Sequence, residues 1–351
     1  MRILLIKMSS MGDVFHTFPA LSDAQQNIPG LIVDWVVEGA FSEIPKWHPV
    51  VDKVYPIELR KWRTSLFRKQ TRQEIKAFFK EVNQTDYDLV IDAQGLLKSA
   101  WVARKINAKI AGYDWKSARE PLATLFYDSK CSVAKNQHAI LRLRQLVAQG
   151  LGYVLPENAP IVYGLDTQAW SKPQLVTEQF AEHEYWVFLH GTTWDTKYWP
   201  ESYWIELLKK VNALGKKVIL PWGNQEEHER ALRITSSLEG QNNPSGRKVW
   251  VPPEMLSLND MAKTLKNAEA VVSVDTGLSH VAAALEVPMV VLYRVTDPKL
   301  VGADGSEVVR LESPCAPDYI KKFSNHNQEI ESLQGLSVDD VLSALLEKLK
   351  G

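Results

Sequence analysis

Short runs of apolar and β-branched residues alternate with longer amphipathic stretches along the first half of the chain. This alternation is typical of a parallel sheet whose faces are covered by helices. The apolar runs predict strands over residues 3–6, 31–37, 51–56 and 89–91. The amphipathic stretches predict helices over residues 14–26, 63–82 and 96–106. The first half therefore predicts an open α/β unit.

The second half of the chain repeats the alternation. Strands are predicted over residues 186–189, 218–220, 249–251, 270–274 and 289–292. Helices are predicted over residues 201–214, 225–238, 258–267 and 278–285. Both halves thus predict Rossmann-like α/β units with parallel sheets, in which ligands bind beyond the carboxyl ends of the strands.

The segment that joins the two halves has the composition of a linker. From Pro156 to Pro173 no periodicity is sustained, and the segment contains three prolines. The length of 351 residues also exceeds the roughly 250 to 300 residues at which a single hydrophobic core stops growing. We therefore predict two domains, over residues 1–170 and 171–330, with a site in the cleft between them.

The last residues of the chain, 331–351, predict a separate terminal helix. Ser337 and Asp340 have the spacing of a capping box, and pairs of apolar residues follow them at helical period. We expect this helix to pack back toward the amino-terminal domain.

Composition and charge exclude several classes of protein. With 45% hydrophobic and 24% charged residues the chain is not a disordered or collagen-like sequence. Its two cysteines, Cys131 and Cys315, are too far apart in sequence for a thiolate zinc motif or a disulfide framework. The amino-terminal apolar run is too short for a secretory signal, and no run approaches the ~20 residues of a membrane-spanning helix. We expect a cytoplasmic protein.

The net charge of −1 gives no global field that would attract nucleic acid, but the charges are unevenly distributed. Residues 1–150 contain 22 Lys and Arg against 15 Asp and Glu, so that part carries +7 and the remainder −8. Part of the excess lies in Arg60, Lys61 and Arg63, which surround Trp62 and have a composition suited to an anionic ligand. The amino-terminal half therefore predicts an acidic partner.

A polar turn follows the first predicted strand and contains Gly12 and Asp13. Asp13 either caps the helix that begins there or presents a carboxylate at the end of the strand. Further polar groups follow the strand over residues 89–91: Asp92 either caps a helix or serves the site, and Gln94 lies beside it. Arg119 either pairs with a neighbour such as Glu120 or binds a ligand.

Two loops in the second half have the composition of phosphate sites. One follows the strand over residues 270–274 and contains Asp275, Thr276 and Gly277, so that backbone amides at the start of a helix could bind a phosphate. The alternative is that Asp275 only caps that helix. His280, one turn further, is either a ligand or a packing histidine.

The other loop contains Thr192, Thr193 and Lys197, which offer hydroxyl donors and a positive charge. Two such loops in one domain predict a nucleotide diphosphate. Neither loop brings the carboxylate cluster that an octahedral magnesium site needs. The chain also contains no G-x-G-x-x-G and no Walker A motif, so neither dinucleotide binding nor P-loop chemistry has support.

Five motifs together closely resemble the lipopolysaccharide heptosyltransferase I family, in order along the chain: residues 7–14, 92–96, 118–122, 220–223 and 273–280. The resemblance implies a GT-B fold, with two facing Rossmann-like domains and a central cleft. It also implies an inverting glycosyltransferase that moves L-glycero-D-manno-heptose from ADP-heptose to Kdo of lipid A, in the biosynthesis of the lipopolysaccharide inner core.

The resemblance further implies roles for individual residues. Asp13 would be the general base. The donor would be bound by Thr192, Thr193, Lys197, Asp275, Thr276, Gly277 and His280, with Glu226 at the adenosine ribose and Met255 near the adenine. The acidic acceptor would be bound by Arg60, Lys61, Arg63, Arg119 and Gln94. No metal and no cofactor is expected, because electrostatics would stabilise the departing ADP.

The chain departs from the family pattern at two places. The basic run near residue 60 extends one position further in the family, where this chain has Thr64. The family's Gly-Pro before Thr-Asp-Pro is replaced by Arg294 and Val295. We expect no nucleic-acid partner, a monomer, and peripheral contact with the cytoplasmic face of the inner membrane. Alternatives are the second heptosyltransferase, a GT-B-like sugar-nucleotide epimerase and a non-enzymatic nucleotide-binding module.

Overall fold

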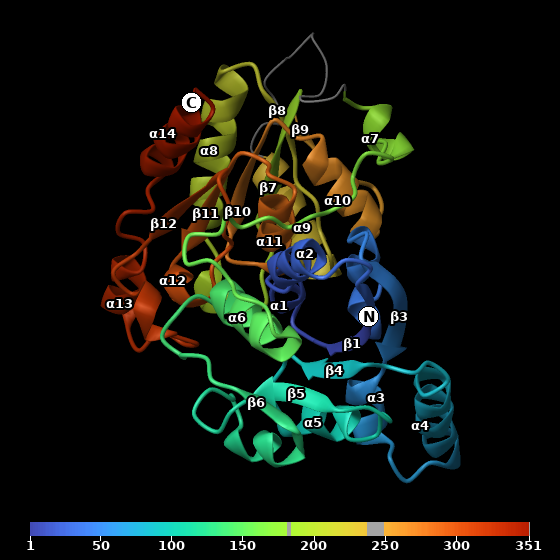
Figure 1. Ribbon diagram of the computed structural model, residues 1–351. Coiled ribbons are helices and arrows are strands. Elements are labelled where there is room, and N and C mark those ends of the chain that lie inside the picture. The colour runs from blue at the N-terminus through green and yellow to red at the C-terminus, as the bar shows by residue number, and fades with distance from the viewer. Residues whose placement is uncertain (181–183, 237–248, 351) are drawn as a thin grey trace. The chain divides into compact units, whose positions relative to one another are not determined.

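The computed structural model describes residues 1–180, 184–236 and 249–350. The chain divides into two compact units, Met1–Thr167 and Gln168–Gly351. The division falls within the proline-bearing segment that joins the two halves of the sequence. Each unit contains one six-stranded sheet, and all strand pairs of both sheets are parallel (Figure 1).

The sheet of unit 1 has the strand order β3-β2-β1-β4-β5-β6. Its strands are β1 (Arg2–Ile6), β2 (Ile32–Glu38), β3 (Val51–Ile57), β4 (Leu89–Asp92), β5 (Ile110–Tyr113) and β6 (Ser129–Cys131). The sequence order reverses between β1 and β4, which are neighbours in the sheet. Such a reversal opens a crevice beyond the carboxyl ends of these two strands, where ligands bind in doubly wound sheets.

Helices cover both faces of this sheet. They are α1 (Met11–Phe15), α2 (Phe18–Asn27), α3 (Leu59–Thr64), α4 (Lys69–Val82), α5 (Leu97–Ala103) and α6 (Ala139–Leu151), with the short 3₁₀ helices η1 (Gly39–Phe41), η2 (Ile44–Trp47) and η3 (Pro121–Phe126). Figure 1 shows α2 and α6 on one side of the sheet, and α3 and α5 on the other.

The predicted elements of unit 1 are present with two interruptions. The helix expected over residues 14–26 is divided into α1 and α2, because Pro19 has no N–H to continue the helix and its ring clashes with the preceding turn. The helix expected over residues 63–82 is divided into α3 and α4 by residues 65–68. Consequently Arg60, Lys61 and Arg63 lie together on the short helix α3.

The sheet of unit 2 has the order β12-β11-β10-β7-β8-β9, which is the order of unit 1 read from the other edge. Its strands are β7 (Tyr185–Leu189), β8 (Lys217–Ile219), β9 (Val249–Trp250), β10 (Ala270–Val274), β11 (Met289–Tyr293) and β12 (Val308–Glu312). Here the order reverses between β7 and β10. The two halves of the chain therefore share one topology, and each has its own switch point.

The described helices of unit 2 include the four that the sequence predicts for residues 171–330, and also three short helices that it does not predict. They are α7 (Gln174–Thr177), α8 (Glu201–Ala213), α9 (Gln225–Ser236), α10 (Leu258–Lys266), α11 (Gly277–Ala284), α12 (Pro298–Val301), α13 (His326–Glu331) and α14 (Val338–Lys348), with η4 (Asp195–Lys197) and η5 (Ala316–Asp318). Residues 237 and 238 of the helix expected over 225–238 lie outside the described residues. Within the described ranges, no helix combines the length and the apolar character needed to cross a bilayer.

The terminal helix α14 begins at the predicted capping box. The Ser337 amide donates to Oδ2 of Asp340 at 3.1 Å, and the Asp340 amide donates to Oγ of Ser337 at 3.2 Å. Contrary to our expectation, its apolar side chains do not pack toward the amino-terminal domain. Val341 and Leu345 are fully buried in the core of unit 2, where α14 packs on α8 and β11 (Figure 1).

Candidate active site: a half-site in each unit

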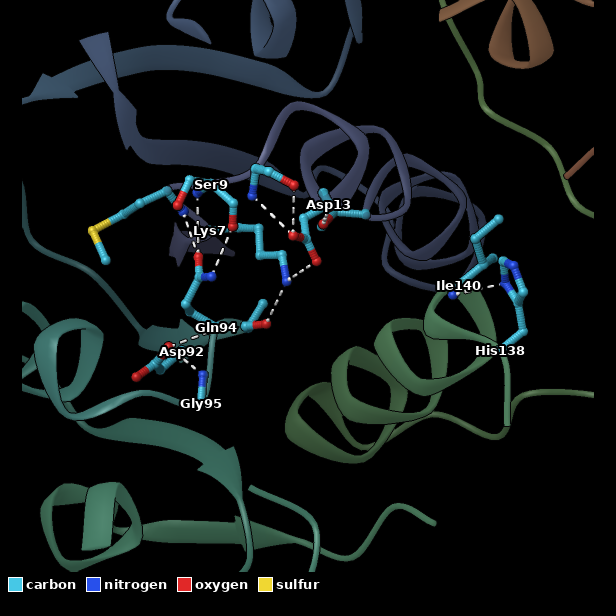
Figure 2. Close-up of polar contacts among 12 residues, drawn as sticks. Lys7, Ser9, Asp13, Asp92, Gln94, Gly95, His138 and Ile140 are labelled. Atoms are coloured by element: carbon cyan, nitrogen blue, oxygen red, sulfur yellow. Dashed lines mark hydrogen bonds and ion pairs between the residues drawn. The ribbon is translucent and has the colours of Figure 1, made fainter. Parts of the chain in front are cut away.

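In unit 1, the loops that follow β1 and β4 meet at the switch point. Ile6 and Asp92, the last residues of the two strands, are partners in the sheet register. The first loop is held by the side chain of Gln94 from the second: Oε1 accepts from the amides of Met8 and Ser9 at 2.9 and 3.3 Å, and Nε2 donates to the Ser9 carbonyl at 2.7 Å. Figure 2 shows Gln94 reaching across to the first loop.

Asp13 lies in α1, directly after the first loop. It is not the N-cap, which is Ser10, but occupies the third helical position and closes a capping box. Its Oδ2 accepts from the amide and the hydroxyl of Ser10 at 2.8 and 3.1 Å. Its Oδ1 lies 3.1 Å from Nζ of Lys7, and about a third of the side chain, 34%, is exposed. Asp13 therefore combines a structural role with an accessible carboxylate.

The charge of Asp13 is stabilised by its neighbours. Burial by itself would raise the pKa of the Asp13 carboxyl, but the charges of Lys7 and His16 and the hydrogen bond from Ser10 outweigh burial and hold that pKa below its ordinary range. Lys7 is buried and also donates to the Ala93 carbonyl at 3.3 Å (Figure 2). The group is thus a carboxylate at any ordinary pH, able to accept a proton but weakly basic.

Asp92 has no accessible carboxylate and belongs to the scaffold. It is fully buried and accepts four hydrogen bonds, from the amides of Gln94 and Gly95, the hydroxyl of Ser99 and the hydroxyl of Tyr127. Burial raises its pKa, and these donors oppose the rise. Of the two interpretations of Asp92, a structural role is therefore the better one.

The cations of unit 1 lie at its surface. Arg60, Lys61 and Arg63 are exposed on α3, and Arg119 is exposed just before η3. Lys61 pairs with Glu74 at 3.4 Å, whereas the guanidinium groups of the three arginines form no ion pair within the described ranges. In particular, Arg119 does not pair with Glu120. The three arginines are therefore available to an anionic ligand.

In unit 2, the loops after β7 and β10 meet at the second switch point. Thr192 from the first loop donates its hydroxyl to the Asp275 carbonyl at 2.9 Å. Lys197, in η4, places Nζ 2.6 Å from Oδ2 of Asp275 and 4.6 Å from the centroid of the Trp194 ring. The sequence predicted Thr192, Lys197 and Asp275 as parts of one site, and the fold brings them together.

The start of α11 adds backbone donors to this group. Thr276 is the N-cap and Gly277 the first helical residue, so Asp275 precedes the helix and does not cap it. The first amides of a helix have no partner within the helix and carry the positive end of its dipole. His280 follows one turn later and is 5% exposed, so it is a buried side chain of the helix and not an open ligand.

Three predicted donor residues do not contact this group. Thr193 is exposed beside Thr192, and Glu226 and Met255 are exposed on α9 and after β9. Glu227, which the sequence analysis did not single out, lies at the end of β7 instead. A β-carbon built on Gly191 would lie 2.4 Å from the Glu227 carboxylate, which also accepts from the Gly223 amide at 2.7 Å. The sequence signal that could have indicated Glu227 is Gly191, a glycine in the loop after β7, together with the adjacent glutamates Glu226 and Glu227.

Three further residues near the site were not predicted in the roles that the structure shows. Lys7 belongs to the first motif, but the sequence did not predict it as the partner of Asp13. Arg294, which replaces a glycine of the family pattern, is buried and donates to Oγ of Ser332 at 2.6 Å and to the carbonyl of Tyr198. Its side chain thereby ties the loop that carries Lys197 to the segment after β12. Thr64 ends α3 and donates to the Lys61 carbonyl at 2.8 Å.

In Figure 2, His138 lies on the other side of Asp13 from Gln94, and its ring packs against that of His16. The centroids of the two rings are 5.4 Å apart in an edge-on arrangement, and Nδ1 of His138 accepts from the Ile140 amide at 3.2 Å at the start of α6 (Figure 2).

No group of three or more His, Cys, Asp or Glu side chains in the described part of the chain is arranged to hold a metal ion.

Two doubly wound units of identical topology, each with polar loops at its switch point, define the GT-B class of glycosyltransferases. The profile of glycosyltransferase family 9 (heptosyltransferase) matches residues 75–328. The chain belongs to this family, and the protein is a heptosyltransferase.

Individual relatives support the assignment over nearly the whole chain. Lipopolysaccharide heptosyltransferase 1 of Pseudomonas aeruginosa is 50% identical over 324 residues, which are 90% of this chain and 86% of that protein. The structure of E. coli heptosyltransferase WaaC with ADP has a TM-score of 0.85 and 41% identity, and covers 99% of this chain and 100% of that one. The structure of the same E. coli enzyme with ADP-2-deoxy-2-fluoro heptose has a TM-score of 0.82 and 42% identity, over 99% of each chain.

Proposed function

We propose that this heptosyltransferase transfers L-glycero-D-manno-heptose from ADP-heptose to a Kdo sugar of lipid A, with inversion at the anomeric carbon. The relatives named lipopolysaccharide heptosyltransferase 1 and the E. coli structures with ADP and an ADP-heptose analogue support the choice of reaction and donor. Unit 1 would bind the acceptor and unit 2 the donor.

In the proposed reaction, Asp13 accepts the proton of an acceptor hydroxyl. The hydroxyl oxygen forms a bond to the anomeric carbon of heptose as the bond from that carbon to the diphosphate breaks, and the electron pair leaves with ADP. A base placed within hydrogen-bond reach contributes about 10² to 10⁴ in rate. Lys7 keeps Asp13 ionised, so the base is ready before the acceptor arrives.

The donor half of the proposal rests on the group at the second switch point. Lys197, the hydroxyls of Thr192 and Thr193, and the amides of Thr276 and Gly277 would stabilise the charge that develops on the diphosphate. Such preorganised donors are worth more for a developing charge than for the ground state. Since Lys197 pairs with Asp275, the diphosphate would compete with that carboxylate for the ammonium group.

The remaining donor contacts follow from positions around the same loops. Asp275 would accept from hydroxyls of heptose, and Glu227 is better located than Glu226 to accept from the ribose hydroxyls, because it lies against the end of β7. Met255 and His280 would flank the adenine and the donor side without polar contacts. On unit 1, the free guanidinium groups of Arg60, Arg63 and Arg119 would bind the carboxylate and phosphates of the acceptor.

The observation that supports this proposal most strongly is that each of the two switch points has one Lys–Asp ion pair. Each unit has a lysine paired with an aspartate beyond the carboxyl ends of its central strands. Lys7 and Asp13 both follow β1, whereas Lys197 follows β7 and Asp275 follows β10. A transfer between two substrates needs a base on one side and a phosphate-neutralising cation on the other. A nucleotide-binding module without enzymatic activity needs only the second group.

The test is ADP release by the purified protein from ADP-heptose, with Kdo-lipid A, without acceptor and with EDTA. We expect release only with acceptor, at a rate that EDTA does not change. Release that requires an acceptor already carrying heptose would indicate the second heptosyltransferase of the superfamily. Conversion of a UDP-sugar without any acceptor would indicate an epimerase, which the exposed arginines of unit 1 disfavour.

A further inference from the structure

Six of the exposed apolar side chains of unit 1 lie on, or next to, elements that pack against one another. They are Leu97 and Trp101 on α5, Leu122, Leu125 and Phe126 on η3, and Phe67 in the loop between α3 and α4. Phe67 is 91% and Leu125 71% exposed. In unit 2 the exposed large apolar residues, such as Leu214, are scattered singly over separate elements, which is ordinary for a globular surface.

The elements that present these side chains form one continuous block. α5 packs against η3, and the Leu97 amide donates to the Glu120 carboxylate at 2.7 Å. The ring of Phe79 on α4 packs against that of Trp101 with 5.5 Å between the ring centroids. Trp62 on α3 packs against Phe78 with 5.7 Å between the centroids. Figure 1 shows α3, α4 and α5 along the same edge of unit 1, with the loop between α3 and α4 at its tip.

The same edge carries a run of cations that no acidic residue interrupts. Residues 59–72 contain six Lys and Arg and no Asp or Glu, and all six cations are exposed. Arg72 also directs its guanidinium to the carbonyls of Leu66 and Phe67, at 3.4 and 3.5 Å, which supports the loop that presents Phe67. The loop is therefore held with an apolar tip among positive charges.

We propose that this basic apolar surface, formed by the cations of residues 59–72 and the six apolar side chains named above, docks the enzyme on an anionic lipid bilayer. Apolar side chains inserted at the headgroup level, together with cations attracted to anionic lipid, are the two contributions that reversible binding to a membrane surface combines. The positive charge of the surface is complementary to the negative charge of such a bilayer. The inserted apolar side chains contribute binding free energy that salt does not screen.

This proposal rests on the proposed function, since it supplies the place from which a lipid-linked acceptor would be reached. The cations that the acceptor would need, Arg60 and Arg63, are two of the six cations of this surface and lie on α3. Docking through this helix would bring the headgroup region of the bilayer to the acceptor half-site. The acceptor sugar could then react without its acyl chains leaving the membrane.

The test uses co-sedimentation of the full chain with acceptor-free vesicles of phosphatidylcholine, with and without phosphatidylglycerol. We expect binding that requires phosphatidylglycerol and weakens at about 1 M salt, where the Debye length is about 3 Å. Phe67→Ser with Leu125→Ser should lower the partition coefficient by about tenfold or more, because two apolar side chains no longer leave water. Neither residue has a role in the proposed reaction.

A matched control is Val154→Ser, since Val154 is 85% exposed in unit 1 but lies outside the surface. It should bind vesicles like the unchanged protein. Phe67→Ser alone, at the more exposed of the two positions, serves if the double variant does not fold. Its partition coefficient should also fall, and its denaturation midpoint should not.

Activity then separates docking from chemistry. The double variant should lose activity on acceptor embedded in vesicles and keep it on a water-soluble acceptor without acyl chains. Three results would overturn the proposal: equal vesicle binding by the double variant and the control, binding only to vesicles that contain the acceptor lipid, or dimerisation that the double variant abolishes. Vesicle binding needs no donor, so it can be retained even if the proposed transfer reaction fails.

Discussion

Nζ of Lys7 lies 3.1 Å from Oδ1 of Asp13, and the two side chains come from opposite ends of one loop. Lys7 is the first residue after β1, whereas Asp13 lies in the first turn of α1. Ser10, between them, fixes the other carboxylate oxygen. The loop therefore holds a charged carboxylate in one orientation at the switch point of the sheet.

We predict that Lys7→Gln raises the pKa of Asp13 toward the ordinary value of about 4. Lys7 stabilises the ionised form, so its removal makes protonation easier. The acidic limb of the profile of kcat/KM against pH should move to higher pH, because that limb reports ionisation in the free enzyme. A profile that keeps its acidic limb while its height changes would contradict control of Asp13 by Lys7. Lys53→Gln, at an exposed lysine of β3, is the control.

Lys197→Ala should weaken ADP binding by about 10- to 100-fold, since a hydrogen bond to a charged group is worth about 1.5 to 3 kcal/mol. The loss leaves the buried Asp275 without its ion pair and facing the diphosphate. Calorimetric titration with ADP measures the affinity. Lys209→Ala, at an exposed lysine of α8, should bind ADP normally. Equal affinity of the two variants would remove Lys197 from the phosphate site.

Replacing both Arg60 and Arg63 with Gln should raise the KM for the acceptor by about tenfold or more and leave the KM for ADP-heptose unchanged. Both guanidinium groups are exposed and form no ion pair within the described residues, so the change should not unfold the protein. Steady-state kinetics with each substrate varied in turn measures the two constants. Lys76→Gln with Lys80→Gln on α4 changes the charge equally. The opposite pattern of KM changes would assign α3 to the donor.

Stability should fall on acidification because of His48. Burial lowers the pKa of His48 to about 4, below its ordinary value of 6.5. Its Nδ1 accepts from the Val50 amide at 3.2 Å and its Nε2 lies 3.1 Å from Oγ of Ser22, an arrangement that suits the neutral ring. The unfolded chain thus binds the proton more tightly between pH 6.5 and pH 4. The free energy of unfolding should decrease by up to about 3 kcal/mol across that interval.

Urea denaturation at several pH values between 4 and 7 measures this dependence. His48→Gln should be less stable than the unchanged protein at pH 7, with a shallower dependence on pH. The quantity to compare is the difference in the free energy of unfolding between the two proteins. Buried His190, whose pKa is also lowered to about 4 by burial, contributes equally to both proteins and cancels in this difference. A difference in the free energy of unfolding that stays constant from pH 4 to pH 7 would show that His48 binds protons equally in the folded and unfolded chain.

The sequence predicted the central strands and the loops at the switch points because these strands are apolar on both faces and their polar turns follow at once. It missed β5 and β6, which are short and contain glycine or polar residues such as Gly112 and Lys130, and β12, which lies at a sheet edge. These strands are specified by pairing with neighbours, and pairing is not visible in local composition.

The site shows the same limit. The residue types of both half-sites were predictable, but the pairing of Lys7 with Asp13 and the contact of Glu227 with Gly191 depend on how loops fold back over the ends of strands. The core on which α14 packs is likewise determined by tertiary contacts that the local sequence does not specify. Its stripe of apolar residues predicts that one face is buried, and says nothing about which core receives it.

The most direct test of the proposed mechanism is the Asp13→Asn variant, examined for transfer and for donor binding together. We predict that transfer of heptose to Kdo-lipid A falls by about 10² to 10⁴, while the affinity for ADP, measured by calorimetry, stays unchanged because the donor half-site belongs to unit 2. Near-normal turnover in this variant, at an unchanged denaturation midpoint, would contradict the assignment of Asp13 as the base.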